Sequence, residues 1–200
     1  MLFRSQQVRA QVARDDRLIT DPYERQAVVT GGASLLGDAG LWAESDALLQ
    51  ANLAKSPSPY YLMSQLGGNA KKLGRKDEAL RWYGQAFDKS EGPATRVQWG
   101  AGYVSALLEL APTDAARIEK TVTQLLTEAG RDSGIFQGRS VQQLKRMGGK
   151  LMSWNADGKQ AAVLGRLQTT LNGVCGKIDA ADGQRAACAS LLKPTGKKAA

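Results

Sequence analysis

The stretch that decides the fold reads SQLGGNAKKLGRKDEALRWYGQAFDKSEGP and runs from Ser64 to Pro93. It contains two runs that are typical of helices, separated by Gly74, a residue that easily takes the left-handed conformation ending a helix. Gly40 lies 34 residues earlier, in the similar segment from Asp38 to Leu41. Recurrence at a fixed distance of this size indicates a structural repeat.

Thirty-four residues is the period of the tetratricopeptide repeat (TPR), a pair of packed helices. Around Gly74, small residues stand where paired helices must approach each other, and large ones stand where side chains fill the gap. The small residues are Gly67, Ala79 and Ala86, and the large ones are Leu66, Tyr83 and Phe87. A weaker match lies 34 residues earlier, at Ala33, Gly40, Ser45, Leu49 and Pro57. A third, distorted match keeps Ala101 but lacks the turn glycine.

Helical patterns continue through the rest of the chain, with capping residues Asp21, Asp114, Ser140 and Asp182. The expected helices span 6–19, 20–37, 114–130, 140–154, 160–177 and 182–192. No window alternates with the two-residue period of a strand. We therefore predict an all-α fold, in which antiparallel helical hairpins stack as a short, right-handed TPR-like solenoid with a C-terminal helical hairpin. Unrelated helical hairpins are the alternative.

The same sequence patterns predict how the chain is divided into regions. Residues 1–19 look like a helix already under way, so we expect a truncated linker that follows a missing upstream domain. Residues 20–112 are expected to form the TPR-like repeats, and residues 113–192 a C-terminal helical region. Residues 193–200 are expected to form a disordered basic tail.

The composition excludes several chemistries. The chain has no histidine and two cysteines, which excludes Ser-His-Asp and Cys-His systems, zinc sites that need imidazole, and four-thiolate zinc sites. The cysteines are too far apart for a C-x-x-C dithiol. The acidic clusters at Glu44, Asp46, Asp77 and Glu78 stand at helix starts, where favourable interaction with the helix dipole explains them. We predict no catalytic residue, metal or cofactor.

The net charge of +8 is concentrated in the second half of the chain. Residues 1–93 carry 12 basic and 11 acidic side chains, whereas residues 94–200 carry 15 and 8. A basic surface is expected at Arg139, Lys145, Arg146 and Lys150. A solvated helix face is the favoured interpretation, and an adaptor that binds an acidic partner or nucleic acid through residues 139–166 is the alternative. Nucleic acid is the less favoured partner because no recognised motif accompanies the charge.

Two further sets of residues carry predictions. Cys175 and Cys188 bracket a helical hairpin that could bring them within bridging distance, although two buried free thiols remain possible. In TPR arrays the first helix of each pair lines a concave groove, which suits an extended peptide. The expected lining is Thr30, Ser34, Ser64, Gly68, Lys71, Lys72, Gln98, Gly102 and Ser105. Most aromatic residues, including Trp154, have core spacing.

Several segments of the sequence resemble the helical region of bacterial thioredoxin-family proteins, which are similar to disulfide isomerases. These segments include residues 20–28, residues 39–49 and residues 89–100, together with the closing segment from Cys175 to Cys188. The family's C-x-x-C motif belongs to a thioredoxin domain that has no match here. The resemblance therefore implies a non-catalytic accessory domain that binds substrate or partner protein.

The resemblance also implies a periplasmic location, which agrees with a disulfide because disulfides persist in oxidising compartments. The sequence contains no apolar run near the roughly 20 residues that cross a bilayer. Protein or extended peptide is the expected partner, and the oligomeric state is left open.

Overall fold

The computed structural model describes residues 2–132 and 134–193, with side chains from Ser5 onward. Residues 194–200, which include nearly all of the predicted basic tail, lie outside the described residues. The chain divides into two compact units, residues 1–90 and residues 91–200.

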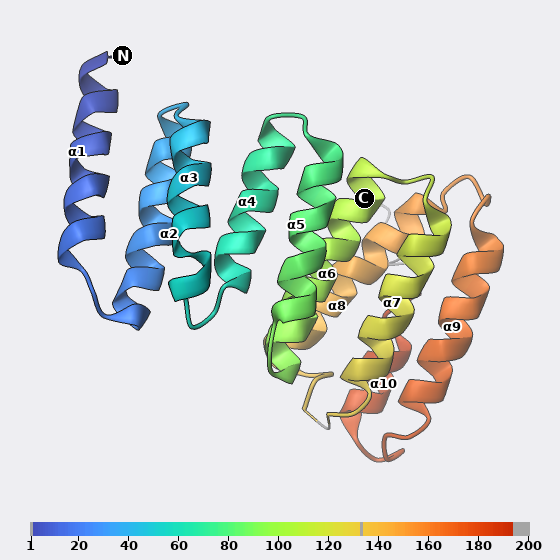
Figure 1. Ribbon diagram of the computed structural model, residues 1–200. Helices are drawn as coiled ribbons and strands as arrows, with labels where there is room; N and C mark the ends of the chain where they lie inside the picture. Colours follow the sequence, from blue (N-terminus) through green and yellow to red (C-terminus); the bar gives the residue numbers. More distant parts are fainter. Residues whose placement is uncertain (1, 133, 194–200) are drawn as a thin grey trace, which may run out of the picture. The chain divides into compact units, whose positions relative to one another are not determined.

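Unit 1 consists of helices packed in chain order (Figure 1). Each α-helix packs against the next along the chain, and α2 also contacts α4. The helices are α1 (Leu2–Leu18), α2 (Pro22–Asp38), α3 (Trp42–Asn52), the short 3-10 helix η1 (Leu53–Lys55), α4 (Tyr60–Lys72) and α5 (Lys76–Lys89).

Unit 2 has a different pairing. Helix α6 packs against both α7 and α8, α7 packs against α9, and α9 packs against α10. These helices are α6 (Pro93–Leu110), α7 (Ala115–Ala129), α8 (Gly138–Trp154), α9 (Ala161–Cys175) and α10 (Gly183–Ala189). Within the described residues every regular element is helical, so the predicted all-α class is confirmed.

The two turn glycines adopt the same local structure. Gly40 and Gly74 have φ of +77° and +74°, the left-handed region expected of them. In each turn the glycine N–H donates to the carbonyl three residues back, and the next residue donates to the carbonyl five residues back. This pair of bonds is the Schellman motif, which satisfies the last carbonyls of a helix. The 34-residue repeat is thus present in the backbone as well as in the sequence.

Packing in unit 1 follows the predicted small and large positions. A Cβ added to Gly67 would lie 3.1 Å from the ring of Tyr83, so the absence of a side chain lets α4 and α5 approach. Leu66 and Phe87 are almost completely buried. The core of α2, α3 and α4 comprises Val29, Ala33, Leu49, Leu62 and Leu66.

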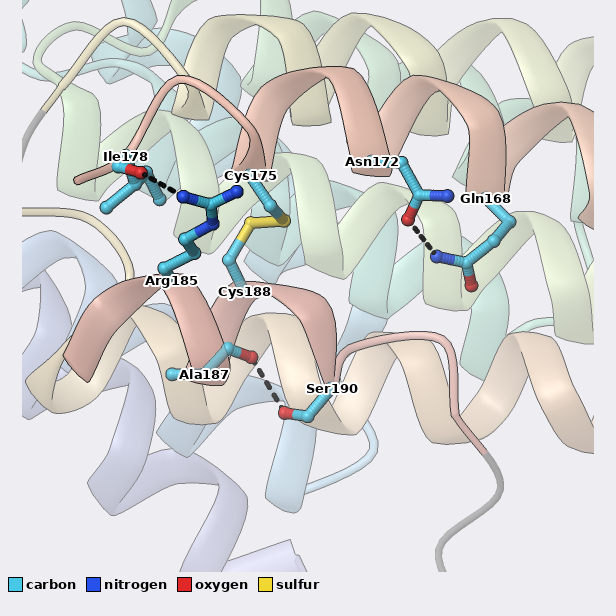
Figure 2. The surroundings of a disulfide bond; sticks show 8 residues. All are labelled: Gln168, Asn172, Cys175, Ile178, Arg185, Ala187, Cys188 and Ser190. Atoms are coloured by element: carbon cyan, nitrogen blue, oxygen red, sulfur yellow. Dashed lines mark hydrogen bonds between the residues drawn. A yellow bond between two sulfur atoms is a disulfide. The ribbon is translucent and has the colours of Figure 1, made fainter. Parts of the chain in front are cut away.

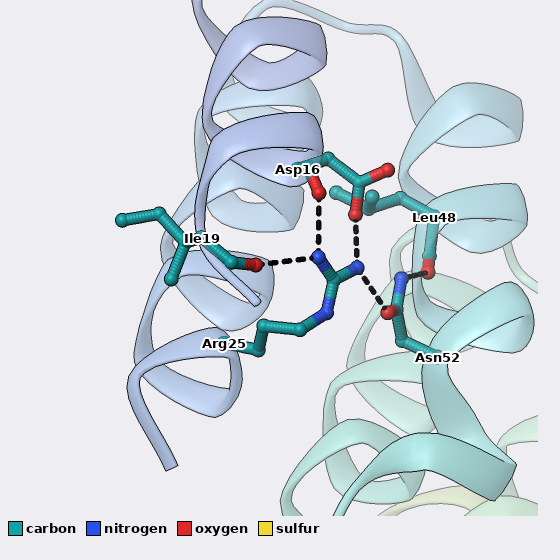
Figure 3. A network of polar contacts seen from close by, with 5 residues as sticks. All are labelled: Asp16, Ile19, Arg25, Leu48 and Asn52. Carbon is teal, nitrogen blue, oxygen red and sulfur yellow. Dashed lines mark hydrogen bonds and ion pairs between the residues drawn. The ribbon is translucent and has the colours of Figure 1, made fainter. Parts of the chain in front are cut away.

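Arg25 joins three helices at one end of unit 1 (Figure 3). Its guanidinium donates to the Asp16 carboxylate and to the Asp16 and Ile19 carbonyls, and it donates at 2.7 Å to the Asn52 amide oxygen. Residues before Ile19 therefore pack as part of unit 1 through α1.

Helix starts follow the predicted caps in most places. Asp21, Asp114 and Asp182 each accept a backbone hydrogen bond at the start of the next helix, as expected. The prediction that Ser140 opens a helix is wrong, because α8 begins at Gly138 after Gln137. The last helix ends at Ala189, three residues before the predicted end, because the chain turns there and buries Leu191 and Leu192.

Candidate functional site

An open groove with a volume of about 710 Å³ lies between α6 and α8 of unit 2. Helix α6 contributes one wall and α8 the other. The lining residues are Ser105, Leu108 and Glu109 from α6, and Arg146, Gly149, Lys150, Ser153 and Trp154 from α8.

The helical period explains why these α8 residues share a wall. Arg146, Lys150 and Trp154 are each separated by four residues, which places them one above the other on one face. The opposite face of α8 is apolar and buried. A Cβ added to Gly149 would meet nothing within 4 Å, so the missing side chain widens the groove.

The two cations that line this groove differ from several arginines of unit 2 in their ion-pair partners. Three other arginines of the unit have partners: Arg96 pairs with Glu128, Arg166 pairs with Glu119, and Arg117 donates at 2.7 Å to the Tyr103 hydroxyl. Arg146 and Lys150 are exposed and form no ion pair with any residue in the described part of the chain. The α8 wall is therefore positive and accessible.

Trp154 closes one end of the groove. Its indole N–H donates at 2.8 Å to the carbonyl of Pro112, which follows α6. This bond fixes the ring beside the groove, and Leu108 adds a second apolar surface. Trp154 is half-buried, although its spacing favoured the core. The groove thus combines two cations with an apolar end.

The serine hydroxyls on the two walls are oriented by their own helices. Ser105 donates to the carbonyl of Ala101, and Ser153 donates to the carbonyl of Gly149. A hydroxyl that donates in this way keeps its lone pairs as acceptors. The groove therefore offers hydrogen-bond acceptors on both walls.

The predicted groove residues divide between the two units. In unit 1, the side chain of Gln65 donates at 3.0 Å to the Thr30 carbonyl and at 2.8 Å to the Ser34 hydroxyl, which ties α4 to α2. Neither the repeat nor the charge pattern predicts this role of Gln65. Ser64, Gly68 and Lys71 are half-buried on α4, and Lys72 is exposed.

In unit 2, Gln98 and Gly102 lie on α6 before Ser105. Ser105 lines the groove together with Arg146 and Lys150. The structure thus brings Ser105 of the predicted groove set together with two residues of the predicted basic set, whereas Gln98 and Gly102 lie outside the lining. Arg139 and Lys145 are exposed on α8 outside the lining. No local sequence pattern marks Leu108, Glu109, Gly149 or Ser153, whose role depends on the packing of α6 against α8.

A second hollow of about 360 Å³ lies between the start of α6 and the end of α7. Its charged lining includes Arg96, which donates to the Glu128 carboxylate through two nitrogens. Burial alone would raise the pKa of Glu128, but hydrogen bonds from Arg96 and Gln124 outweigh it and hold the pKa below its ordinary value. These charges are occupied with each other, so the α6–α8 groove is the stronger candidate.

A disulfide holds the last helices of unit 2 together (Figure 2). Cys175, at the end of α9, is bonded to Cys188 in α10, with 5.7 Å between the Cα atoms. Both cysteines are buried. After α10 the backbone of Leu191 packs directly on Gly148 of α8, where any Cβ would overlap its carbonyl oxygen. The disulfide-linked segment therefore supports α8 next to Gly149.

In the part of the chain that the structure describes, no helix is long and apolar enough to cross a membrane. The acidic and cysteine side chains of residues 2–132 and 134–193 form no group of three or more that could hold a metal ion.

The comparisons with known proteins concern the fold. No protein-family signature and no curated protein sequence matches this chain. Two similar crystal structures are of the nearly identical TPR-like repeats of a kinesin light chain-like protein from Podosopora anserina. A single-substitution form aligns with a TM-score of 0.56 at 12% identity, covering 84% of this chain and 85% of the other. The second structure aligns with a TM-score of 0.55 at 14% identity, covering 86% of each chain. This chain therefore has a TPR-like helical repeat fold.

Proposed function

We propose that this chain is a protein-interaction domain that binds an extended peptide segment in the α6–α8 groove. The observation that carries the proposal is the lining of that groove, where two exposed cations, two serines and an apolar end face one open channel. TPR-like folds commonly present such surfaces to extended peptides. The partner is therefore a protein segment with acidic character.

The proposed role is non-catalytic. The chain has no histidine, and both cysteines are committed to a disulfide. Glu109 is the one acidic residue that lines the groove, so the lining has no second carboxylate with which it could share acid and base roles. Binding is the chemistry that this arrangement supports.

The parent protein is proposed from the sequence resemblance. The chain is the accessory helical region of an exported thioredoxin-family protein, and its location is the periplasm. The Cys175–Cys188 disulfide supports an oxidising compartment. Expression of the chain with and without an export signal tests this proposal by intact mass. An exported form that folds and binds peptide with its two cysteines unbridged would contradict it.

A second candidate function is the binding of nucleic acid through residues 139–166. Four exposed cations on α8 favour it, namely Arg139, Lys145, Arg146 and Lys150. Two other cations of that segment are engaged, because Lys159 pairs with Asp157 and Arg166 pairs with Glu119. A steep loss of affinity with salt for RNA, but not for peptide, would favour this function.

The direct test is selection from a random peptide library against the full chain. Gly149→Leu adds a side chain at a position that lines the groove, where a Cβ would meet nothing within 4 Å. Gly165→Leu is the matched control, because Gly165 is also in an open helical position but lies on α9 outside the lining. We expect the selected peptides to bind Gly149→Leu at least about tenfold more weakly, the loss of about 1.4 kcal/mol. Equal binding to both variants, or no selected peptide, would refute the proposal.

A further inference from the structure

We propose that the α6–α8 groove recognises a peptide by the spacing of three side chains. Two acidic residues and one apolar residue stand at alternate positions, in the pattern acidic-x-acidic-x-apolar. The order is given along α8 from Arg146 to Trp154. This inference rests on the proposed peptide-binding function and specifies the partner of the same groove.

The spacing follows from the geometry of the two chains. Four residues of an α-helix rise about 6 Å, which separates Arg146 from Lys150 and Lys150 from Trp154 along the axis. Alternate residues of an extended strand project on the same side at intervals of about 6.6–6.8 Å. An extended peptide along α8 therefore places every second side chain opposite one of these three residues. Long lysine and arginine side chains absorb the small mismatch.

The chemistry of the three positions fixes the residue types. Arg146 and Lys150 are exposed cations, so acidic side chains complement them. At the third position the indole N–H of Trp154 is already bonded to Pro112, which leaves the ring as an apolar contact. Leu108 lines the same groove from α6. An apolar side chain suits that position best.

The α6 wall sets the side on which the acids lie. Glu109 places a carboxylate there, which disfavours an acidic side chain near α6 and favours the α8 side. The hydroxyl oxygens of Ser105 and Ser153 keep acceptor capacity for peptide N–H groups. The peptide backbone thus lies between the serines, with its acids toward α8.

Labelled peptides with one composition test the spacing. The matched peptide is Ser-Glu-Ser-Glu-Ser-Leu-Ser, and the comparison peptide is Ser-Ser-Glu-Glu-Ser-Leu-Ser, both also made in reverse order. Affinities are measured by fluorescence polarisation with the full chain. Of the forward and reversed matched peptides, the one that binds more tightly should have an affinity about fivefold higher than either comparison peptide. Equal affinities, or no binding of any of them at millimolar concentration, would overturn the spacing.

Two lysines of α8 supply the matched protein variants. Lys150→Glu reverses a charge in the groove, whereas Lys145→Glu makes the same change on α8 outside the lining. We expect Lys150→Glu to weaken the matched peptide about fivefold and Lys145→Glu less than about twofold. Equal losses would show a response to net charge alone and would overturn the inference, as would tighter binding of polyuridine than of the matched peptide.

Failure of this inference is distinguishable from failure of the proposed function. If library-selected peptides bind in a Gly149-dependent manner but show no dependence on acid spacing, the spacing alone is wrong. If no peptide depends on Gly149, the peptide-binding function is wrong as well.

Discussion

The backbone carbonyl of Leu191 packs directly on the Cα of Gly148, leaving no space for a Cβ. The two residues lie in different segments, because Gly148 is in the middle of α8 and Leu191 follows α10. The next residue, Gly149, faces open space and lines the groove. Two adjacent glycines thus serve opposite faces of one helix, one for close packing and one for access.

This arrangement predicts opposite effects of two neighbouring substitutions. Gly148→Ala should destabilise unit 2 by about 1–3 kcal/mol, because backbone must move to accept the methyl group. Gly149→Ala should stabilise it by about 0.5–1 kcal/mol, because alanine favours the helix and has space. Urea unfolding of both variants measures the difference. Effects of the same sign would contradict the packing described here.

The disulfide should support α8 through the segment that follows α10. Cys175 and Cys188 are 13 residues apart, and a bridge of that span contributes about 3 kcal/mol. Replacing both with serine should lower the free energy of unfolding of unit 2 and speed hydrogen exchange in α8 near Gly148. Helix α4, in unit 1, is the internal control and should exchange as before. Unchanged hydrogen exchange in α8 would contradict the claim that the disulfide-linked segment supports this helix.

The repeat predicts equal roles for its two turn glycines. Gly40→Ala and Gly74→Ala should each cost about 1–2 kcal/mol, because both positions require positive φ. Gly31→Ala is the control, since Gly31 lies inside α2 with space for a methyl group, and it should stabilise by up to about 1 kcal/mol. Thermal unfolding compares the three. A neutral effect at either turn would argue against the shared motif.

The Arg96–Glu128 pair predicts an acid-dependent loss of stability. The pKa of Glu128 is lower in the folded chain than in the unfolded chain, so its contribution is present above the unfolded value of about 4.3. It is lost as the pH falls from there through the lower folded value. Glu128→Gln should reduce stability at pH 7 and flatten the decline below about pH 4.3. Glu91→Gln removes the same charge at an exposed position and is the matched control.

The sequence predicted those parts of the fold that depend on local backbone chemistry. Gly40 and Gly74 are the clearest case, because a positive φ at a helix end leaves few other residue choices. Gly67 against Tyr83 is a second case, in which a repeat position implied a close contact before the helices were seen. Caps such as Asp114 are a third. Each rests on residues close together in the chain.

The groove depends on contacts that are distant in sequence. No repeat signal pairs α8 with α6, so Ser105 and Lys150 belonged to separate predicted sets. Gln65 on α4 donates to the Thr30 carbonyl on α2, and the residues next to Gln65 in the sequence do not indicate that bond. The helix-period pattern also placed Trp154 with the core residues of α8, although its indole ends beside an open channel. Tertiary packing decides these positions.

The most direct test of the groove is an NMR titration of the ¹⁵N-labelled chain with a library-selected peptide. The chain has four tryptophans, and of these Trp154 lines the α6–α8 groove. We expect the indole N–H of Trp154 and the amide of Gly149 to shift together in a saturable manner, while the other three indole signals stay in place. Saturable shifts confined to α9 or to unit 1, with the Trp154 signal unmoved, would contradict it.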